Sequence, residues 1–452
     1  MNKINSVKDK LLGNSGRTSL IKKNVLASFF IKAWTALVQL LLVPLTLSCL
    51  GVYENGVWLT IGSILLWIDN LDIGLGNGLR NKLAIYMARD DINKAREMVS
   101  STFAMLVIII IPSAILMIVG ELFTDNYHLL NVDHSKVPQL DIILLVTTIL
   151  VCMTFVFKFL GNFYMGLQLP AINNLIGCLG NTLILLGTFI VYKSGCHSML
   201  LIALVNTGAP LLVYLICYPI TFAGRYKMLS PSLKFVTVSA IRELFSLGIK
   251  FFLLQIPAII LFFTSNILIS HLFSPSMVTP YQIAHRYFTV TMTLFTIICV
   301  PYWTATTDAY ERKDFSWIKK ANKTLNKIML FILVIIAVMT ILSESVYHIW
   351  IQEKAYIPFS ITLISAVYQF VILLSMRYSF VLNGIGALHL QLVFTMVAAI
   401  MYLPLAIFVG KTTHNINDLL IVMCLVHLPG LIINYIQYHK IIKGQATGIW
   451  IK

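Results

Sequence analysis

Charged residues are scarce in this sequence: they occupy only 11% of its 452 positions, and Asp and Glu together number only 18. Hydrophobic residues make up 58%, a proportion that excludes a water-soluble globular domain. The apolar runs are about 20 residues long, which is the length an α-helix needs to cross a hydrocarbon core of roughly 30 Å. The alternating pattern of a membrane β-barrel is missing. The sequence therefore predicts an all-α polytopic membrane protein.

Several chemical signatures are also missing. The seven cysteines are scattered without a CxxC or a mixed His/Cys spacing, so we expect neither a disulfide nor a metal site. No G-x-x-x-x-G-K-[ST] motif for ATP phosphates occurs, so energy for any transport must come from an ion gradient, the membrane potential or the substrate gradient. The loops between apolar runs are too short to house a catalytic domain, and we expect no enzyme activity and no cofactor beyond a coupling Na⁺ or H⁺.

Twelve apolar runs are long enough to be membrane spans. They cover residues 25–50, 55–75, 98–120, 139–157, 172–192, 199–221, 247–270, 281–305, 327–345, 357–382, 388–410 and 418–438. A polar, basic linker over 223–245 separates an N-terminal six-helix lobe, residues 1–222, from a C-terminal six-helix lobe, residues 246–452. The first span lacks the small-residue cleavage pattern of a signal peptide, so we expect it to remain in the membrane.

The distribution of basic residues predicts the orientation. With the N-terminus inside, 26 of the 33 Lys and Arg fall in interior segments, and only Lys136, Lys193, Lys354 and Lys411 fall in exterior loops. This bias follows the positive-inside rule, and an even number of spans places both termini in the cytoplasm. The net charge of +15 then reflects topology and contact with anionic membrane lipid, and it requires no nucleic-acid partner.

The two lobes show weak internal similarity. At an offset of about 218 residues, Ser28 to Lys32 aligns with Ser246 to Lys250. Because each six-span unit starts and ends on the same side, such copies are parallel repeats about a pseudo-twofold axis along the membrane normal. Repeats of this kind commonly enclose a central site that opens to alternate sides.

Three basic residues lie inside predicted spans: Lys32, Lys250 and Arg286. A lysine at the centre of a membrane helix costs about 2.5–3.5 kcal/mol on insertion scales, so these side chains should face protein or water unless they extend to the interface. If they share one cavity, that cavity is electropositive and suits a phosphate or diphosphate. We predict that the three bind substrate, with extension to the interface as the alternative.

Two acidic residues, Asp69 and Asp72, lie near the cytoplasmic end of the second span, three positions apart and so on one helical face. With Arg80 they form a predicted ion-coupling or gating group, and a purely structural clasp with Arg80 is the alternative. Glycines at 74, 76 and 78 follow in a spacing that does not match a dinucleotide fingerprint and instead favours close helix approach. Four amide side chains within the spans either line a cavity or bond across helices, and we favour the second for each: Gln255, Asn266, Gln369 and Gln391.

The stretch Asn55-Gly-Val-Trp-Leu-Thr60, followed by Trp67 to Asn81, resembles the second span of Wzx-type flippases for O-antigen and capsular polysaccharide. These belong to the multidrug/oligosaccharidyl-lipid/polysaccharide exporter superfamily. The glycine-containing links Gly166 to Pro170 and Asn383 to Gly386 agree with the resemblance.

The resemblance implies a flippase that moves undecaprenyl-diphosphate-linked oligosaccharide across the bacterial inner membrane by alternating access with ion coupling. Its partners would be that polyprenyl-diphosphate-linked glycan, membrane lipid, a polysaccharide polymerase and glycosyltransferases. The alternative is a cation-coupled, multidrug-type antiporter of small molecules on the same scaffold.

Overall fold

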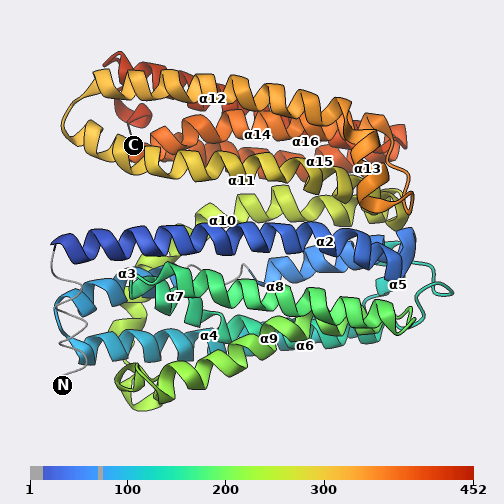
Figure 1. Ribbon diagram of the computed structural model, residues 1–452, viewed down its shortest axis with the longest axis horizontal. Coiled ribbons are helices and arrows are strands. Elements are labelled where there is room, and N and C mark those ends of the chain that lie inside the picture. Colours follow the sequence, from blue (N-terminus) through green and yellow to red (C-terminus); the bar gives the residue numbers. More distant parts are fainter. Residues whose placement is uncertain (1–13, 70–74, 452) are drawn as a thin grey trace. The chain divides into compact units, whose positions relative to one another are not determined.

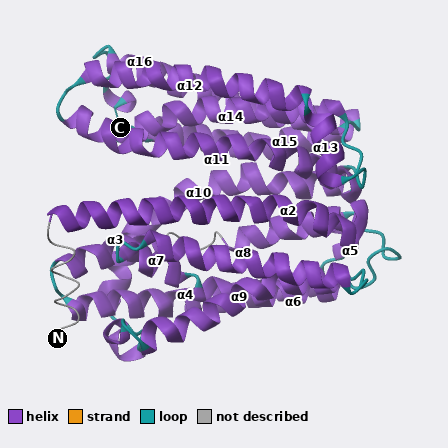
Figure 2. Ribbon diagram, viewed as in Figure 1, coloured by secondary structure: helices purple, strands orange, loops and turns teal. Residues whose placement is uncertain are grey.

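The structure is a computed structural model that describes residues 14–69 and 75–451. Every regular element within these residues is a helix (Figure 2). This follows from the apolar composition, because backbone groups in lipid must be hydrogen-bonded inside their own segment. Contacts divide the chain into two compact units.

Unit 1 contains the residues up to Cys49, then Leu65–Asp125 and Gln139–Leu253. Its helices are the first part of α2 (Asn14–Asp69), α3 (Leu75–Ala88), α4 (Ile92–Phe123), α6 (Leu140–Phe157), α7 (Phe159–Gly166), α8 (Pro170–Lys193), α9 (Met199–Ala223), the short η1 (Lys227–Leu229) and η2 (Leu233–Phe235), and the start of α10 (Val238–Leu272) (Figure 1). Within this unit α8 packs on α9, α9 on α6, and α6 on α4.

Unit 2 contains Leu50–Ile64, Asn126–Pro138 and Leu254–Lys452. Its helices are α5 (Asn126–Leu130), the rest of α10, α11 (Pro275–Glu311), α12 (Phe315–Ile341), α13 (Ser343–Ile351), α14 (Phe359–Ile385), α15 (His389–Thr413), α16 (Ile416–Ile442) and the short η3 (Gly448–Trp450) (Figure 1). Here α14 packs on α11, α12 and α16, and α16 packs on α15.

A break in α2 separates the first two predicted spans. Gly51 has φ 69° and ψ −177°, a left-handed conformation that interrupts the helix and that glycine adopts without strain. The second predicted span, 55–75, begins after this break, but the helix ends at Asp69, and residues 70–74 lie outside the described part of the chain. The break at residue 51 therefore agrees with the predicted loop between residues 50 and 55.

The protein is a multi-pass membrane protein. Within the described residues, nine helical segments are long and apolar enough to cross a bilayer, and one of them, Ser28–Ile68, is long enough to hold both spans that flank Gly51. Large apolar side chains such as Leu116, Leu122 and Ile341 are more than 70% exposed, as expected of surfaces that contact acyl chains.

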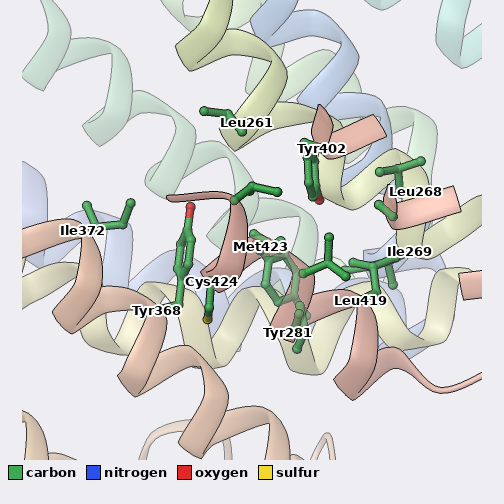
Figure 3. Close-up of a cluster of buried hydrophobic side chains, with 14 of the residues drawn as sticks. Leu261, Leu268, Ile269, Tyr281, Tyr368, Ile372, Tyr402, Leu419, Met423 and Cys424 are labelled. Atoms are coloured by element: carbon green, nitrogen blue, oxygen red, sulfur yellow. The ribbon is translucent and has the colours of Figure 1, made fainter. Parts of the chain in front are cut away.

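The core of unit 2 combines aliphatic and aromatic side chains from five helices. Figure 3 shows Leu261, Leu268 and Ile269 of α10 beside Tyr281 of α11, Tyr368 of α14, Tyr402 of α15 and Leu419, Met423 and Cys424 of α16. Tyr402 is completely buried and its hydroxyl lies 2.8 Å from the Ser265 hydroxyl, so one of the two donates to the other. This bond satisfies a phenol that would otherwise be costly to bury.

Candidate translocation site

The first candidate site residue, Lys32, lies on α2 and its side chain is exposed. Gln39 is seven residues further along the helix and is therefore on the same side, two turns away. Gln39 is also exposed, and it lies near the midpoint of the helical segment between Ser28 and the Gly51 break. A charged and an amide side chain thus share one face of a membrane-spanning segment.

Polar bonds on both sides of an apolar seam join this part of α2 to α8. Gln39 Nε2 donates to Asn181 Oδ1 at 2.8 Å, and Trp34 Nε1 donates to Thr182 Oγ1 at 3.0 Å. Between them, Val38 and Leu42 pack against Ile184 and Ala209. We call the surface formed by Lys32, Gln39 and Asn181, on one side of this seam, the α2/α8 face.

The α2/α8 face lies at mid-membrane depth, because Asn181 is close to the centre of the 24-residue α8. Facing lipid would leave the remaining hydrogen-bonding capacity of Gln39 and the charge of Lys32 without water, at a cost of several kcal/mol by order of magnitude. Water contact removes that cost. The arrangement therefore favours a water-accessible surface, the kind of environment in which transporters place substrate sites.

The structure does not place the other two predicted substrate-binding residues, Lys250 and Arg286, beside Lys32. Lys250 lies in α10, but its side chain is outside the described set, so its predicted role stays a prediction. Arg286 is in α11 of unit 2 and is partly exposed. Its neighbour in sequence, His285, has its ring 6.0 Å from Tyr281 and 6.2 Å from Tyr368. Lys32 and Arg286 belong to different units, so their convergence in one cavity also stays a prediction.

The predicted coupling group is only partly visible. Asp69 is the last residue of α2 and its side chain is not described, while Asp72 lies outside the described residues. Arg80 lies on α3 and is exposed. The clasp and the ion-coupling alternative both stay open.

A different ion pair holds α3, and sequence reasoning missed it. Lys82 of α3 pairs with Glu243 at the start of α10, and the Tyr86 hydroxyl donates to the same carboxylate at 2.9 Å. Lys82 and Tyr86 are four residues apart and therefore lie on one helical face, where they can contact the same partner. This spacing alone does not identify Glu243 as that partner. Desolvation opposes ionisation of Glu243, but the bonds from Lys82 and Tyr86 outweigh it and hold the pKa of this carboxyl below its ordinary value.

One glycine of the predicted close-approach series supports that prediction. A Cβ on Gly78 would lie 3.1 Å from the Leu244 carbonyl oxygen, so the α3 and α10 backbones approach each other closely at this point. Leu244 directly follows Glu243, and the close approach and the ion pair therefore reinforce one contact within unit 1.

Unit 2 has its own polar network, and it is buried. Asn266 of α10 donates to the Ser63 hydroxyl at 2.7 Å and to the Leu59 carbonyl at 3.2 Å, and it accepts from Gln282 of α11 at 2.7 Å. The predicted bonding across helices is confirmed for Asn266. Among the residues that the structure describes, no group of three His, Cys, Asp or Glu side chains could hold a metal ion.

The stretch from Asn55 to Thr60, which carries the resemblance to flippases, packs within unit 2. Asn55 Nδ2 donates to Thr279 Oγ1 at 3.2 Å, and Thr279 donates to the Val52 carbonyl at 2.8 Å. A Cβ on Gly56 would overlap the Pro275 carbonyl oxygen. In this structure these residues dock a helix against the start of α11.

Solved transporter structures share this architecture. An inward-facing conformation of a multidrug resistance MATE family transporter of the MOP superfamily matches with a TM-score of 0.77 at 16% identity, covering 93% of this chain and 98% of that chain. The chain has the same fold. An outward-facing conformation of such a transporter matches with a TM-score of 0.61 at 18% identity, covering 94% and 96%. A MATE structure described as the straight conformation matches with a TM-score of 0.61 at 16% identity, covering 94% and 96%.

No protein-family model and no curated protein matches the sequence. The predicted all-α membrane fold, with twelve spans in two lobes, is confirmed by the fold that these transporters share. At these identities the likeness concerns the fold alone, so the superfamily that the sequence resembles and the polysaccharide flippase subtype both remain predictions.

Proposed function

We propose that this chain is a membrane transporter that works by alternating access and is not an enzyme. The observation that carries the proposal is the α2/α8 face, an exposed polar surface at mid-membrane depth with a lysine on the same side of α2. The fold supports it, because transporters with this fold have been solved in both inward-facing and outward-facing conformations. Coupling to Na⁺ or H⁺ is part of the proposal.

For the substrate, the comparisons support a small organic molecule of the multidrug type. The first-named neighbour and its outward-facing counterpart are both multidrug resistance transporters, and they match over more than nine-tenths of this chain. We therefore place a cation-coupled, multidrug-type antiporter first.

The charge of the α2/α8 face favours a second candidate. Neither residues 25–50 nor α8 contains an Asp or a Glu, so both helices that build the face lack a carboxylate to attract a cationic drug. Lys32 instead offers an ammonium group to an anion. This observation supports a flippase for a polyprenyl-diphosphate-linked glycan. The sequence resemblance adds to this candidate a place in the bacterial inner membrane with both termini cytoplasmic, and a polymerase and glycosyltransferases as partners.

One experiment separates the two candidates. The purified full-length chain is reconstituted in vesicles, and Lys32→Ala and Lys32→Arg are compared with wild type for uptake of a cationic dye and for flipping of a fluorescent undecaprenyl-diphosphate glycan. A diphosphate substrate predicts about tenfold slower flipping for Lys32→Ala and near-normal flipping for Lys32→Arg, because one charge-assisted contact is worth about 1.4 kcal/mol or more.

A cationic substrate predicts no loss of transport when the lysine is removed. Removing the repelling ammonium leaves dye transport unchanged or faster in Lys32→Ala, and Lys32→Arg behaves as wild type. Transport of neither probe by wild-type protein, with correctly inserted and folded chain in the vesicles, would contradict the transporter proposal as stated.

A further inference from the structure

The helix α12 of unit 2 has one exposed ridge whose chemistry changes along its length. Lys319, Lys323 and Lys327 follow one another at four-residue intervals, and all three side chains are exposed. The same ridge continues with Leu330, Val334 and Ile341, which are 65%, 53% and 77% exposed. Successive steps of three, four and seven residues keep these positions on one side of an α-helix.

The opposite side of α12 is packed into the core. Ile318, Leu325, Met329, Ile332 and Ile336 are buried there, and α12 packs on α11 and α14. The helix is therefore held firmly, and its lysine ridge points away from the protein. Asp314, which precedes the helix, accepts from the Trp317 backbone N–H and the Ser316 hydroxyl and so is engaged as the N-cap.

Neither α12 itself nor α14 supplies a carboxylate to the three lysines, while Asp308 and Glu311 of α11 have side chains outside the described set. No Asp or Glu occurs between Asp314 and Glu344, and α14 contains none. Among the side chains that the structure describes, none of these three lysines forms an ion pair. Three like charges within about 12 Å of helix repel one another unless an anion screens them.

The change from lysine to apolar residues along the ridge indicates where the ridge crosses the membrane surface. Lys327 and Leu330 are about one turn apart, so the hydrocarbon boundary falls between them. Lys323 and Lys319 follow about 6 Å and about 12 Å further out along the helix, so Lys323 lies within the headgroup layer and Lys319 at its aqueous edge. A phospholipid has the same order of chemistry, with phosphate oxygens beyond the boundary and acyl chains within it.

We propose that the α12 ridge, formed by Lys319, Lys323, Lys327, Leu330 and Val334, binds an anionic phospholipid. The lysines contact its headgroup oxygens, and the apolar residues contact its acyl chains. Each lysine near an anionic membrane surface contributes about 1 kcal/mol, so three together are enough for selective binding over a zwitterionic lipid.

The test uses the full-length chain in detergent micelles. Phosphatidylglycerol or phosphatidylcholine with identical acyl chains is titrated in, and bound lipid is counted by native mass spectrometry while the unfolding temperature is recorded. Wild type should prefer phosphatidylglycerol and be stabilised by it. The triple variant Lys319→Gln, Lys323→Gln, Lys327→Gln should lose affinity for phosphatidylglycerol by about 100-fold, since three such contacts are removed.

Two control variants make the result specific. The triple Lys→Arg variant at the same positions should retain the preference, whereas Lys193→Gln, Lys354→Gln, Lys411→Gln removes three charges elsewhere and should retain it as well. All variants should unfold at similar temperatures without added lipid, because the ridge side chains are exposed.

The proposal is overturned if the ridge variant keeps its preference, or if the distant variant loses as much as the ridge variant, which would indicate a general charge effect. It is also overturned if inorganic phosphate at the same concentration stabilises wild type as strongly as phosphatidylglycerol, because the acyl-chain contacts would then contribute nothing.

Discussion

On the α2/α8 face of unit 1, Gln39 and Asn181 bond to each other at mid-span, and Gln39 keeps exposed surface. In unit 2, Asn266 also makes interhelical bonds, but it is only 5% exposed and has three bonding partners. The same type of side chain therefore serves two purposes. In unit 2 the amide holds helices together, whereas in unit 1 it leaves hydrogen-bonding capacity available to water or substrate.

The largest effect should come from the close approach of Gly56 to the start of α11 in unit 2. In Gly56→Ala the new methyl overlaps the Pro275 carbonyl oxygen, a backbone atom that cannot move without shifting α11. We expect a loss of about 3 kcal/mol or more in the free energy of unfolding, or failure to yield folded protein. Thermal unfolding in detergent, or the yield of monodisperse protein, measures it.

Gly62→Ala is the matched control, because no heavy atom lies within 4 Å of a Cβ at that position. Both glycines lie in the same helical segment, so intrinsic helix propensity is equal for the two changes. Equal stability of the two variants would show that the contact between this segment and α11 is looser than the structure indicates.

The second prediction compares the stability and transport of variants of the two amide residues, Asn266 and Gln39. Asn266→Leu leaves the Gln282 amide and the Leu59 carbonyl without their partner in a buried site, so it should cost about 1–3 kcal/mol of stability. Gln39→Leu breaks an exposed bond and should cost about 0.5 kcal/mol or less. Transport should show the opposite order, with Gln39→Leu the more defective per folded molecule.

Transport of the dye and of the glycan probe in vesicles, normalised to the amount of folded protein, measures the effect on transport. Thermal unfolding measures the effect on stability. The comparison fails if Gln39→Leu transports normally while Asn266→Leu, once inserted and folded, does not. That outcome would move the substrate site from the α2/α8 face toward unit 2.

Much of the fold could be predicted from the sequence because the bilayer imposes a length on each span. Apolar runs such as 172–192 and 199–221 lie inside helices of nearly the same bounds, Pro170–Lys193 and Met199–Ala223. These spans can be located from the length and apolar composition of each run alone, without knowing which residues far apart in sequence contact each other. The break at Gly51 was equally visible as a gap between two apolar runs.

The candidate site was less predictable, because its bonds join residues far apart in sequence. Lys32 was identifiable from the cost of a charge in lipid, but nothing in the sequence pairs Gln39 with Asn181, 142 residues away. Likewise, Lys82 gave no sign that Glu243, 161 residues away, is its partner. Periodicity shows which side chains share a face, and only the packing of helices shows which face they meet.

A smaller effect than that of Asn266→Leu is expected for the Lys82 to Glu243 pair, which joins α3 to α10 within unit 1 outside the predicted spans. Because the pKa of Glu243 lies below its ordinary value in the folded state, its ionisation stabilises the fold above the unfolded-state pKa of about 4.3, and this contribution is lost as the pH falls through the folded pKa. The two side chains are 24% and 29% exposed, so we expect about 1 kcal/mol or less.

Unfolding temperatures of wild type and Glu243→Gln, measured from pH 7 to pH 3.5, should differ by a constant amount near neutrality and converge at the acid end. Tyr86→Phe serves as the control, because it removes one bond to the carboxylate but leaves the ion pair. A difference in unfolding temperature that stays constant down to pH 3.5 would mean that close packing, rather than the ion pair, stabilises the contact between α3 and α10. In that case Gly78, at its close approach to the Leu244 carbonyl, is the residue that fixes the contact, and Gly78→Ala should then destabilise the protein more than Glu243→Gln does.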